Sequence, residues 1–321
     1  MSIHSGVVLD VASLAEQDLD LSGLMDSLED WDVHPATSRA QTLDRIQGKQ
    51  VAVTNKVVID AEMMRACPEL KLICITATGT NNVDLVAAKE LGITVSNVVA
   101  YATDSVVQHV FAMMLSHFCS LPQYSDGVRS GDWSRSEQFC LLDYPVLELR
   151  GQVLGIIGYG ELGRALAKVA EAFGMKVLIA EREGAGELRE GRIWLDDLLL
   201  QADVISLHVP LADNTENLID SRRLGLMKES ALLINTARGA VVDNKALAEA
   251  LRKGEIGGAA LDVLDQEPPP EDHVLLAGDI PNLLLTPHSA WAGRGARQNV
   301  VNETLANIRA FIAGESRNRV A

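Results

Sequence analysis

The apolar positions of this chain fall into short runs that alternate with stretches showing the spacing of amphipathic helices. Runs that are apolar at consecutive positions are typical of strands buried on both faces of a parallel sheet, and the stretches between them are typical of crossover helices. In the first part of the chain we predict strands at residues 6–9, 51–53, 72–75 and 94–96, with helices at 61–66 and 85–91. The pattern therefore predicts an α/β fold.

The same alternation starts again near residue 153. Here we predict strands at 153–157, 176–180, 204–207, 232–235, 259–262 and 283–285, with helices at 161–173 and 243–252. Longer helical patterns at 104–118 and 297–312 lie on either side of this second series, and the later one can return the chain to the first unit. We therefore expect two doubly wound parallel-sheet domains. One is discontinuous, with residues 1–98 and 288–321, and the other is an insertion of residues 99–287.

The segment "GYGELG" joins the predicted strand at 153–157 to a predicted helix. In a Rossmann crossover, Gly158 would permit the sharp turn, Gly160 would let the backbone approach a pyrophosphate, and Gly163 would let the helix lie close to the strand. The next strand ends in Glu181, where a carboxylate can bind the adenosine ribose hydroxyls. This combination predicts a bound dinucleotide.

Glu181 also favours NAD over NADP, because its carboxylate would repel the additional phosphate of NADP. The following residue, Arg182, acts in the opposite direction, since a guanidinium can turn toward that phosphate. We expect NAD as the cofactor, and NADP stays open.

Composition limits the classes of function that fit. The 321 residues are 47% hydrophobic and carry a formal net charge of −16, which favours solubility and disfavours nucleic acid or an anionic membrane as a partner. The four cysteines lack zinc-type spacing and the histidines form no HExxH pair, so we expect no metal. Neither a leader pattern nor a membrane-spanning apolar run is present, and we expect a cytoplasmic protein.

Three reactive residues each follow a predicted strand of the second series: Arg238, Glu267 and His288. Ligands of open parallel sheets bind at the carboxyl ends of the strands. Arg238 can bind the carboxylate of a 2-keto acid and polarise its keto oxygen, and His288 can supply the proton that this oxygen needs. Glu267 can orient the imidazole and favour its charged form. The three together predict reduction of a 2-keto acid.

From about residue 50 to residue 310 the chain resembles the D-isomer-specific 2-hydroxyacid dehydrogenases. The segments "GYGELG", "NTARGAVVD", "LDVLDQEPP" and "TPHSAW" are similar to signature segments of that family and occur in its order. The resemblance implies a Rossmann NAD-binding domain inserted in a flavodoxin-like catalytic domain, and a homodimer. It also implies that Arg238, Glu267 and His288 are the catalytic residues.

Within the family the segments "ATGTNNVDL", "GDWSRS" and "PHSAWAGRGARQ" resemble those of glycerate dehydrogenases, also called hydroxypyruvate reductases. The resemblance implies reduction of hydroxypyruvate to D-glycerate, and of glyoxylate. It places Asn55, Lys56 and Gly79 at the substrate together with Arg238 and His288, although a solvated surface role for Lys56 is equally compatible with the sequence. Around the cofactor it places Thr103, Gly158, Gly160, Glu161, Leu162, Gly163, Glu181, Pro210, Thr215, Thr236, Ala237, Arg238, Asp262 and His288, with Asp262 near the nicotinamide amide.

Two alternatives stay open at this point. A phosphoglycerate dehydrogenase would carry the same catalytic residues, and it is disfavoured because little sequence follows residue 312. A non-catalytic NAD-sensing module, similar to the transcriptional corepressors of the same superfamily, would also retain them. The sequence leaves undecided which 2-hydroxy acid is used, the physiological direction and the oligomeric state.

Overall fold

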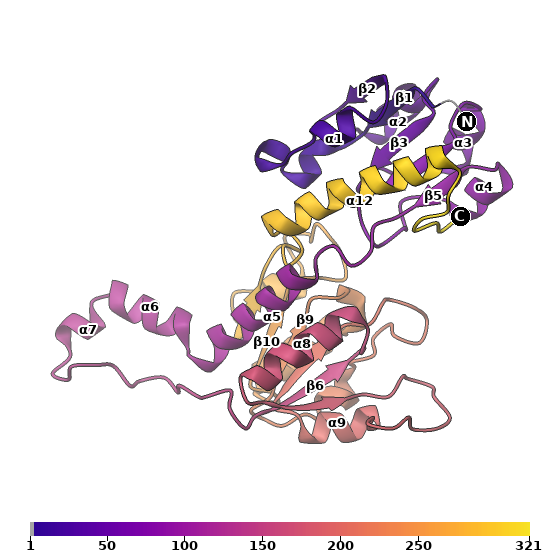
Figure 1. Ribbon diagram of the computed structural model, residues 1–321. Helices are drawn as coiled ribbons and strands as arrows, with labels where there is room; N and C mark the ends of the chain where they lie inside the picture. Colours follow the sequence, from indigo (N-terminus) through magenta and orange to yellow (C-terminus); the bar gives the residue numbers. More distant parts are fainter. Residues whose placement is uncertain (1–2) are drawn as a thin grey trace. The chain divides into compact units, whose positions relative to one another are not determined.

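The computed structural model describes residues 3–321, which divide into two compact units (Figure 1). One unit takes the chain up to Ala102 together with Trp291–Ala321, and the other takes Thr103–Ala290. The expected boundaries were 98/99 and 287/288, so both observed boundaries lie a few residues later in the chain. As a result, His288 belongs to the inserted unit.

The first unit contains a five-stranded parallel sheet with strand order β2-β1-β3-β4-β5, which is the flavodoxin-like order. The strands are β1 (Ser5–Val8), β2 (Asp30–Val33), β3 (Val51–Thr54), β4 (Leu72–Ile75) and β5 (Thr94–Ser96). The helices are α1 (Ser22–Met25), α2 (Arg39–Ile46), α3 (Ala61–Ala66), α4 (Leu85–Glu90) and α12 (Arg294–Ala313).

Consecutive residues of these strands enter two separate hydrophobic clusters, one on each face of the sheet. Ile73 and Ile75 lie in one cluster, whereas Leu72 and Cys74 lie in the other. Helix α12 covers the second face with Val300 among its buried residues. Burial on both faces explains why these strands appear in the sequence as continuous apolar runs rather than alternating ones.

The second unit contains a six-stranded parallel sheet with strand order β11-β10-β9-β8-β6-β7. Its strands are β6 (Val153–Ile157), β7 (Lys176–Ile179), β8 (Val204–Leu207), β9 (Leu232–Asn235), β10 (Gly258–Leu261) and β11 (Leu283–Leu285). Its helices are α5 (Thr103–Phe118), α6 (Leu121–Arg129), α7 (Asp132–Arg135), α8 (Glu161–Ala172), α9 (Leu195–Gln201), α10 (Ser221–Leu224) and α11 (Asn244–Lys253).

The outer edge of this sheet shows its Rossmann character. Ala180, directly after β7, forms a parallel bridge with Ile193, so the third strand of the usual Rossmann order is reduced to a single bridge beside β7. Strand order reverses between β6 and β8, and ligands of doubly wound sheets bind where that reversal occurs. The second unit therefore offers a nucleotide site at the end of β6.

All ten strands expected from the sequence are present, with ends that differ by at most one residue. The strand that sequence analysis missed is β2, "DWDV", at the edge of the first sheet. Three of its four residues are exposed, and therefore no apolar run marks it. Among the described residues, no helix has the length and apolar character needed to cross a membrane.

Candidate active site

The glycine turn of the second unit joins β6 to α8. Gly158 has a φ of 97°, and a Cβ added there would lie 2.4 Å from the carbonyl oxygen of His208. A Cβ on Gly163 would lie 2.3 Å from the carbonyl oxygen of Gly158, whereas a Cβ on Gly160 would meet nothing within 4 Å. No side chain caps the start of α8. The turn thus leaves open space in front of uncapped N–H groups, which fits a pyrophosphate.

A cavity of about 300 Å³ lies beside this turn, within the second unit. Five of the residues expected at the cofactor line it: Gly158, Gly160, Glu181, Pro210 and Thr215. The volume is that of a small ligand pocket. The cavity and the uncapped helix together fit the adenosine and pyrophosphate parts of a dinucleotide.

The carboxylate of Glu181 is already bound by protein groups. Its Oε1 accepts a hydrogen bond from the N–H of Arg182 at 2.7 Å, and its Oε2 accepts one from the N–H of Arg189 at 3.0 Å. The guanidinium of Arg189 adds Nε, at 3.0 Å from both oxygens, and Nη2 on Oε1. These hydrogen bonds, the one from the Arg189 side chain above all, hold the pKa of Glu181 far below its ordinary value. Sequence analysis placed Glu181 at the ribose and did not foresee this partner.

His208 also lines the cavity, and sequence analysis missed it. Its Nε2 lies 2.9 Å from Ser206 Oγ, while its buried Nδ1 has no hydrogen-bond partner among the described residues. Burial lowers the pKa of His208 to about 4, so the ring is neutral at neutral pH. In the sequence, the position of His208 directly after a predicted strand, at its carboxyl end, could have identified it as a site residue. Arg189 lies in a loop away from any strand end, and nothing in the sequence pointed to it.

Arg238, Glu267 and His288 lie in the loops that follow β9, β10 and β11, three neighbouring parallel strands. His288 Nδ1 is 2.6 Å from Glu267 Oε2. Partial burial by itself would raise the pKa of Glu267, but the hydrogen bonds from His288 and from the Leu264 N–H, with the charge of Arg238, outweigh it and lower that pKa. The structure therefore brings the imidazole and the carboxylate into hydrogen-bond contact, near the guanidinium.

The loop carrying Arg238 is held against the loop carrying Glu267. The buried side chain of Asn235 donates to the Arg238 carbonyl at 2.9 Å and accepts from the Ala237 N–H at 3.0 Å. A Cβ on Gly239 would lie only 1.8 Å from the backbone of Leu264, so only glycine permits this approach. This contact explains the glycine directly after the arginine in "ARGA".

The backbone of His288 has a φ of 52°, a left-handed conformation that is unfavourable for a residue with a Cβ. The buried carboxylate of Asp262 holds the following residues: it accepts from the Ser289 N–H at 2.9 Å and from the Ala290 N–H at 2.8 Å. It also accepts from the Thr286 hydroxyl, and the Asp262 carbonyl accepts from the His288 N–H at 2.8 Å. Asp262 therefore supports the histidine loop. Its expected contact with the nicotinamide amide stays a prediction.

The other residues expected at the cofactor take varied positions. The Thr103 hydroxyl donates to the carboxylate of Glu161 at the start of α8, where Leu162 follows it. The hydroxyl of Thr236 is buried and has no hydrogen-bond partner among the described residues, which leaves a donor in the loop next to Arg238. A buried hydroxyl without a partner fits a ligand that supplies a hydrogen-bond acceptor to it.

The residues expected at the substrate from the first unit lie at the carboxyl edge of its own sheet. Asn55 and Lys56 follow β3, and Gly79 comes after the neighbouring strand β4. The buried carboxylate of Asp10 accepts from the N–H of Asn55 and from that of Lys56, both at 2.8 Å. Asp10 thus shapes the turn that carries both residues, a role that the sequence did not reveal.

The described part of the chain contains no group of three or more histidine, cysteine, aspartate or glutamate side chains arranged to hold a metal ion.

Comparison with known proteins identifies the family. Residues 111–290 match the model of the D-isomer specific 2-hydroxyacid dehydrogenase family, NAD binding domain. The chain belongs to this family. It is therefore an NAD-dependent oxidoreductase, and its second unit is an NAD-binding domain.

Individual members of the family are similar over nearly the whole chain. A glycerate dehydrogenase from Methylorubrum extorquens is 46% identical over 87% of this chain and 88% of its own length. A hydroxypyruvate reductase from Blautia hydrogenotrophica is 36% identical over 98% of both chains. A crystal structure of a protein from Thermus thermophilus matches 99% of this chain and all of its own, with a TM-score of 0.83 and 34% identity. The dehydrogenase fold expected from the sequence is thus confirmed.

Replacing Asp262 tests its support of the histidine loop. We expect Asp262→Ala to lower the free energy of unfolding by about 2–4 kcal/mol, because several buried donors lose a charged acceptor. The turnover number should fall about a hundredfold or more, since the loop that carries His288 is no longer held in place. For Asp262→Asn, which keeps one acceptor oxygen, both the free energy of unfolding and the turnover number should lie between those of the wild type and Asp262→Ala. Urea denaturation and steady-state kinetics measure both effects. Asp265→Asn, a change three residues later in the same loop, is the control, and equal losses in both asparagine variants would contradict the assignment.

The buried imidazole of His208 makes stability depend on pH. Its pKa is about 4 in the folded protein and 6.5 ordinarily, so between these values the unfolded chain binds a proton that the folded protein does not. The free energy of unfolding therefore falls as the pH is lowered through this range. Between pH 7 and pH 5 we expect the wild type to lose about 2 kcal/mol more than His208→Gln, which has no titrating group there. Parallel pH dependences in urea denaturation would show that His208 does not titrate in this way.

Proposed function

We propose that this dehydrogenase reduces hydroxypyruvate to D-glycerate and also accepts glyoxylate. The observation that carries the proposal is the 2.6 Å pair between His288 and Glu267, beside Arg238, at the carboxyl edge of the NAD-binding sheet. The substrate is supported by the relatives. Besides the two named above, a protein from Thermococcus litoralis that is 37% identical over 90% of this chain is a glyoxylate reductase.

In the proposed reaction the reduced cofactor supplies a hydride to C2 of the keto acid. His288 supplies the proton to the keto oxygen from Nε2, because its Nδ1 is engaged by Glu267. Glu267 holds the ring in place and stabilises its positive charge, and Arg238 binds the substrate carboxylate and polarises the keto oxygen. One hydride and one proton convert the keto acid to the hydroxy acid.

The first unit contributes the remaining substrate residues in this proposal. Asn55, Lys56 and Gly79 would bind the carboxylate and hydroxyl groups of the substrate through amides and the Lys56 ammonium. Their support is the resemblance to the family and their common position at the carboxyl edge of the first sheet.

A cytoplasmic location is also part of the proposal. It is supported by the free thiols of Cys67, Cys74, Cys119 and Cys140.

A panel of keto acids with NADH and NADPH tests the function. We expect hydroxypyruvate to give the highest kcat/KM, with glyoxylate next, and pyruvate and 3-phosphohydroxypyruvate below them. His288→Ala should lower the turnover number on hydroxypyruvate about a hundredfold or more, because the general acid is removed, while the Kd for NADH stays close to wild type. Absorbance of the reduced nicotinamide and fluorescence titration measure the two effects.

His273→Asn is the matched control for that experiment. His273 also pairs with a carboxylate, with its Nε2 2.7 Å from Asp265 Oδ1, and it has no place in the proposed chemistry. Its turnover number should stay near wild type. No turnover of any keto acid would reject the catalytic proposal and favour the sensing module, and a preference for the phosphorylated substrate would favour phosphoglycerate dehydrogenase.

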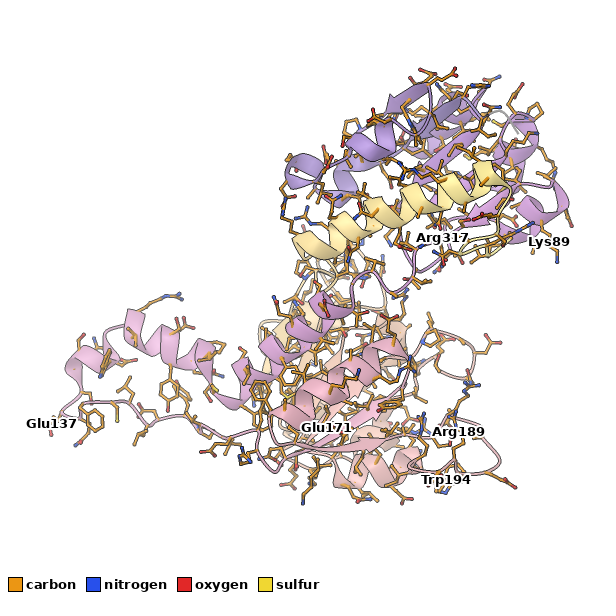
Figure 2. The ribbon with its side chains drawn as sticks, viewed as in Figure 1. Lys89, Glu137, Glu171, Arg189, Trp194 and Arg317 are labelled. Carbon is orange, nitrogen blue, oxygen red and sulfur yellow. The ribbon has the colours of Figure 1, made fainter. Side chains whose placement is uncertain are left out.

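We further propose that the enzyme is a homodimer joined through an arm of the second unit. The arm consists of α6, α7 and the segment up to residue 147, and it extends away from the sheet of that unit, with Glu137 near its far end (Figures 1 and 2). Along it Phe139 is 89% exposed, Leu142 82% and Trp133 51%. Large apolar side chains grouped on one exposed segment are typical of a surface that another protein covers.

Sedimentation velocity tests the dimer. The wild type should sediment as a dimer, and Phe139→Asp combined with Leu142→Asp should sediment as a folded monomer, because two buried charges would be unpaired at the interface. Val86→Asp is the control, since Val86 is 70% exposed on α4 of the other unit and outside the arm. A monomeric wild type, or a double variant that stays dimeric, would contradict the proposal.

A further inference from the structure

The nucleotide cavity of this acidic protein has a basic wall. Arg182, Arg189 and Arg192 line it, together with two acids, Glu181 and Glu183. All five follow β7, where a Rossmann domain holds the adenosine ribose of its cofactor. The whole chain carries a formal net charge of −16, so three arginines at one cavity are a marked local reversal of charge.

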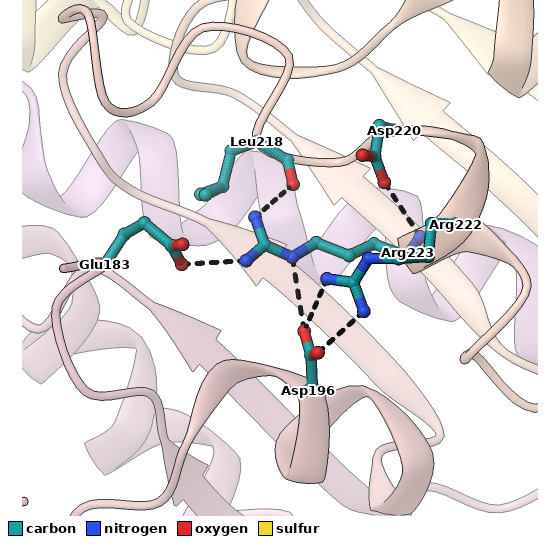
Figure 3. A network of polar contacts seen from close by, with 6 residues as sticks. All are labelled: Glu183, Asp196, Leu218, Asp220, Arg222 and Arg223. Carbon is teal, nitrogen blue, oxygen red and sulfur yellow. Dashed lines mark hydrogen bonds and ion pairs between the residues drawn. The ribbon is translucent and has the colours of Figure 1, made fainter.

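Both acids of the cavity are engaged by arginines. Four N–H groups, those of the Arg182 and Arg189 backbones with Nε and Nη2 of Arg189, occupy the four lone-pair sites of the Glu181 carboxylate. Glu183 Oε2 accepts from Arg223 Nη2 at 2.9 Å, and Arg223 Nε also binds Asp196, as Figure 3 shows. Neither carboxylate therefore faces the cavity as an unpaired negative charge.

Two guanidinium groups are left without an acidic partner. Among the described residues, no carboxylate lies within ion-pair distance of Arg182 or of Arg192. Arg192 is held in place by a hydrogen bond from its Nη1 to the Ala180 carbonyl at 3.1 Å and by the Tyr159 ring, whose centroid is 5.1 Å from its central carbon. Arg182 is exposed at the cavity. The wall therefore has donors and positive charge for an anion.

The anion that a dinucleotide brings to this position is the 2′-phosphate of NADP. We propose that Arg182, Arg189 and Arg192 form the binding site for this phosphate, so that the enzyme uses NADPH as well as NADH. The expected preference for NAD rested on repulsion between Glu181 and the phosphate, and Arg189 neutralises that carboxylate. The phosphate then meets three guanidinium groups, which bind phosphate oxygens by charge-assisted hydrogen bonds.

Arg189 is the residue that sets the balance between the two cofactors. With NADH, the ribose diol can bind Glu181 only by displacing Arg189, because the carboxylate has no free lone pair. With NADPH, Arg189 can stay on the carboxylate and bind the phosphate with its remaining N–H groups. Arg189 thus weakens NADH binding and strengthens NADPH binding. Of the measurements that test this inference, only the kinetic ones rest on the proposed function.

Arg189→Ala tests the inference because its effects on the two cofactors have opposite signs. In the wild type we expect kcat/KM for NADPH to lie within about tenfold of that for NADH. In the variant, kcat/KM for NADPH should fall about tenfold or more, since a cation is lost and Glu181 is exposed, while that for NADH should stay equal or rise. A merely structural defect would lower both.

The second readout is nucleotide binding without any keto acid. Isothermal titration with 2′,5′-ADP and with 5′-ADP measures the contribution of the 2′-phosphate directly. The wild type should bind 2′,5′-ADP more tightly, and both Arg189→Ala and the Arg182→Ala/Arg192→Ala double variant should abolish that advantage while 5′-ADP still binds. Binding of 5′-ADP also reports that each variant is folded.

Arg222→Ala is the matched control. Arg222, like Arg189, has a 56% exposed side chain and binds one carboxylate with two nitrogens, in this case that of Asp196, but it does not line the cavity (Figure 3; Arg189 is labelled in Figure 2). In Arg222→Ala the ratio of kcat/KM for NADPH to kcat/KM for NADH should equal that of the wild type. A wild type that binds 2′,5′-ADP no better than 5′-ADP, or an Arg189→Ala variant with an unchanged ratio, would overturn the inference. Tighter binding of 2′,5′-ADP without turnover would reject only the proposed function.

Discussion

Parallel strand direction is the constraint on which the rest of this structure depends. In the second unit every strand runs the same way, so each loop that follows a strand begins at the same edge of the sheet. Residues 158, 208, 238, 267 and 288 are far apart in the chain and all follow strands of this sheet. The order β9-β10-β11 then makes neighbours of the three loops that carry the arginine, the glutamate and the histidine.

Neighbouring loops alone do not make a reactive pair, and buried polar groups supply the remaining precision. His288 has an unfavourable left-handed backbone, and Asp262 offsets that cost by accepting the N–H groups of the next two residues. Asn235 and Gly239 hold the arginine loop in place, Asn235 by hydrogen bonds and Gly239 by a close approach to Leu264. The positions of the exposed side chains in this site thus depend on buried residues that hold their loops.

Charge is distributed unevenly in this acidic protein. Glu267 is paired with His288 in the loops after β10 and β11, whereas the cluster at the end of β7 collects arginines around a carboxylate. At the end of β7 a ligand therefore meets positive charge, although Glu181, the residue expected at the ribose, is acidic. The identity of Glu181 therefore gives an incomplete account of the charge at this position, because a loop residue eight positions later, Arg189, pairs with it.

The sequence by itself determined the architecture and the family. Buried strands need continuous apolar runs, and a glycine turn needs positions without Cβ atoms, so strands, crossover helices and the nucleotide turn could all be recognised locally. The exposed edge strand β2 was missed because its burial pattern carries no such signal. Only the tertiary structure decided the pairing of Glu181 with Arg189, the support of the His288 loop by Asp262, and the turn held by Asp10. These three interactions depend on which loops meet in space. The polar side chains that form them are not regularly spaced in the chain, so no sequence pattern predicts them.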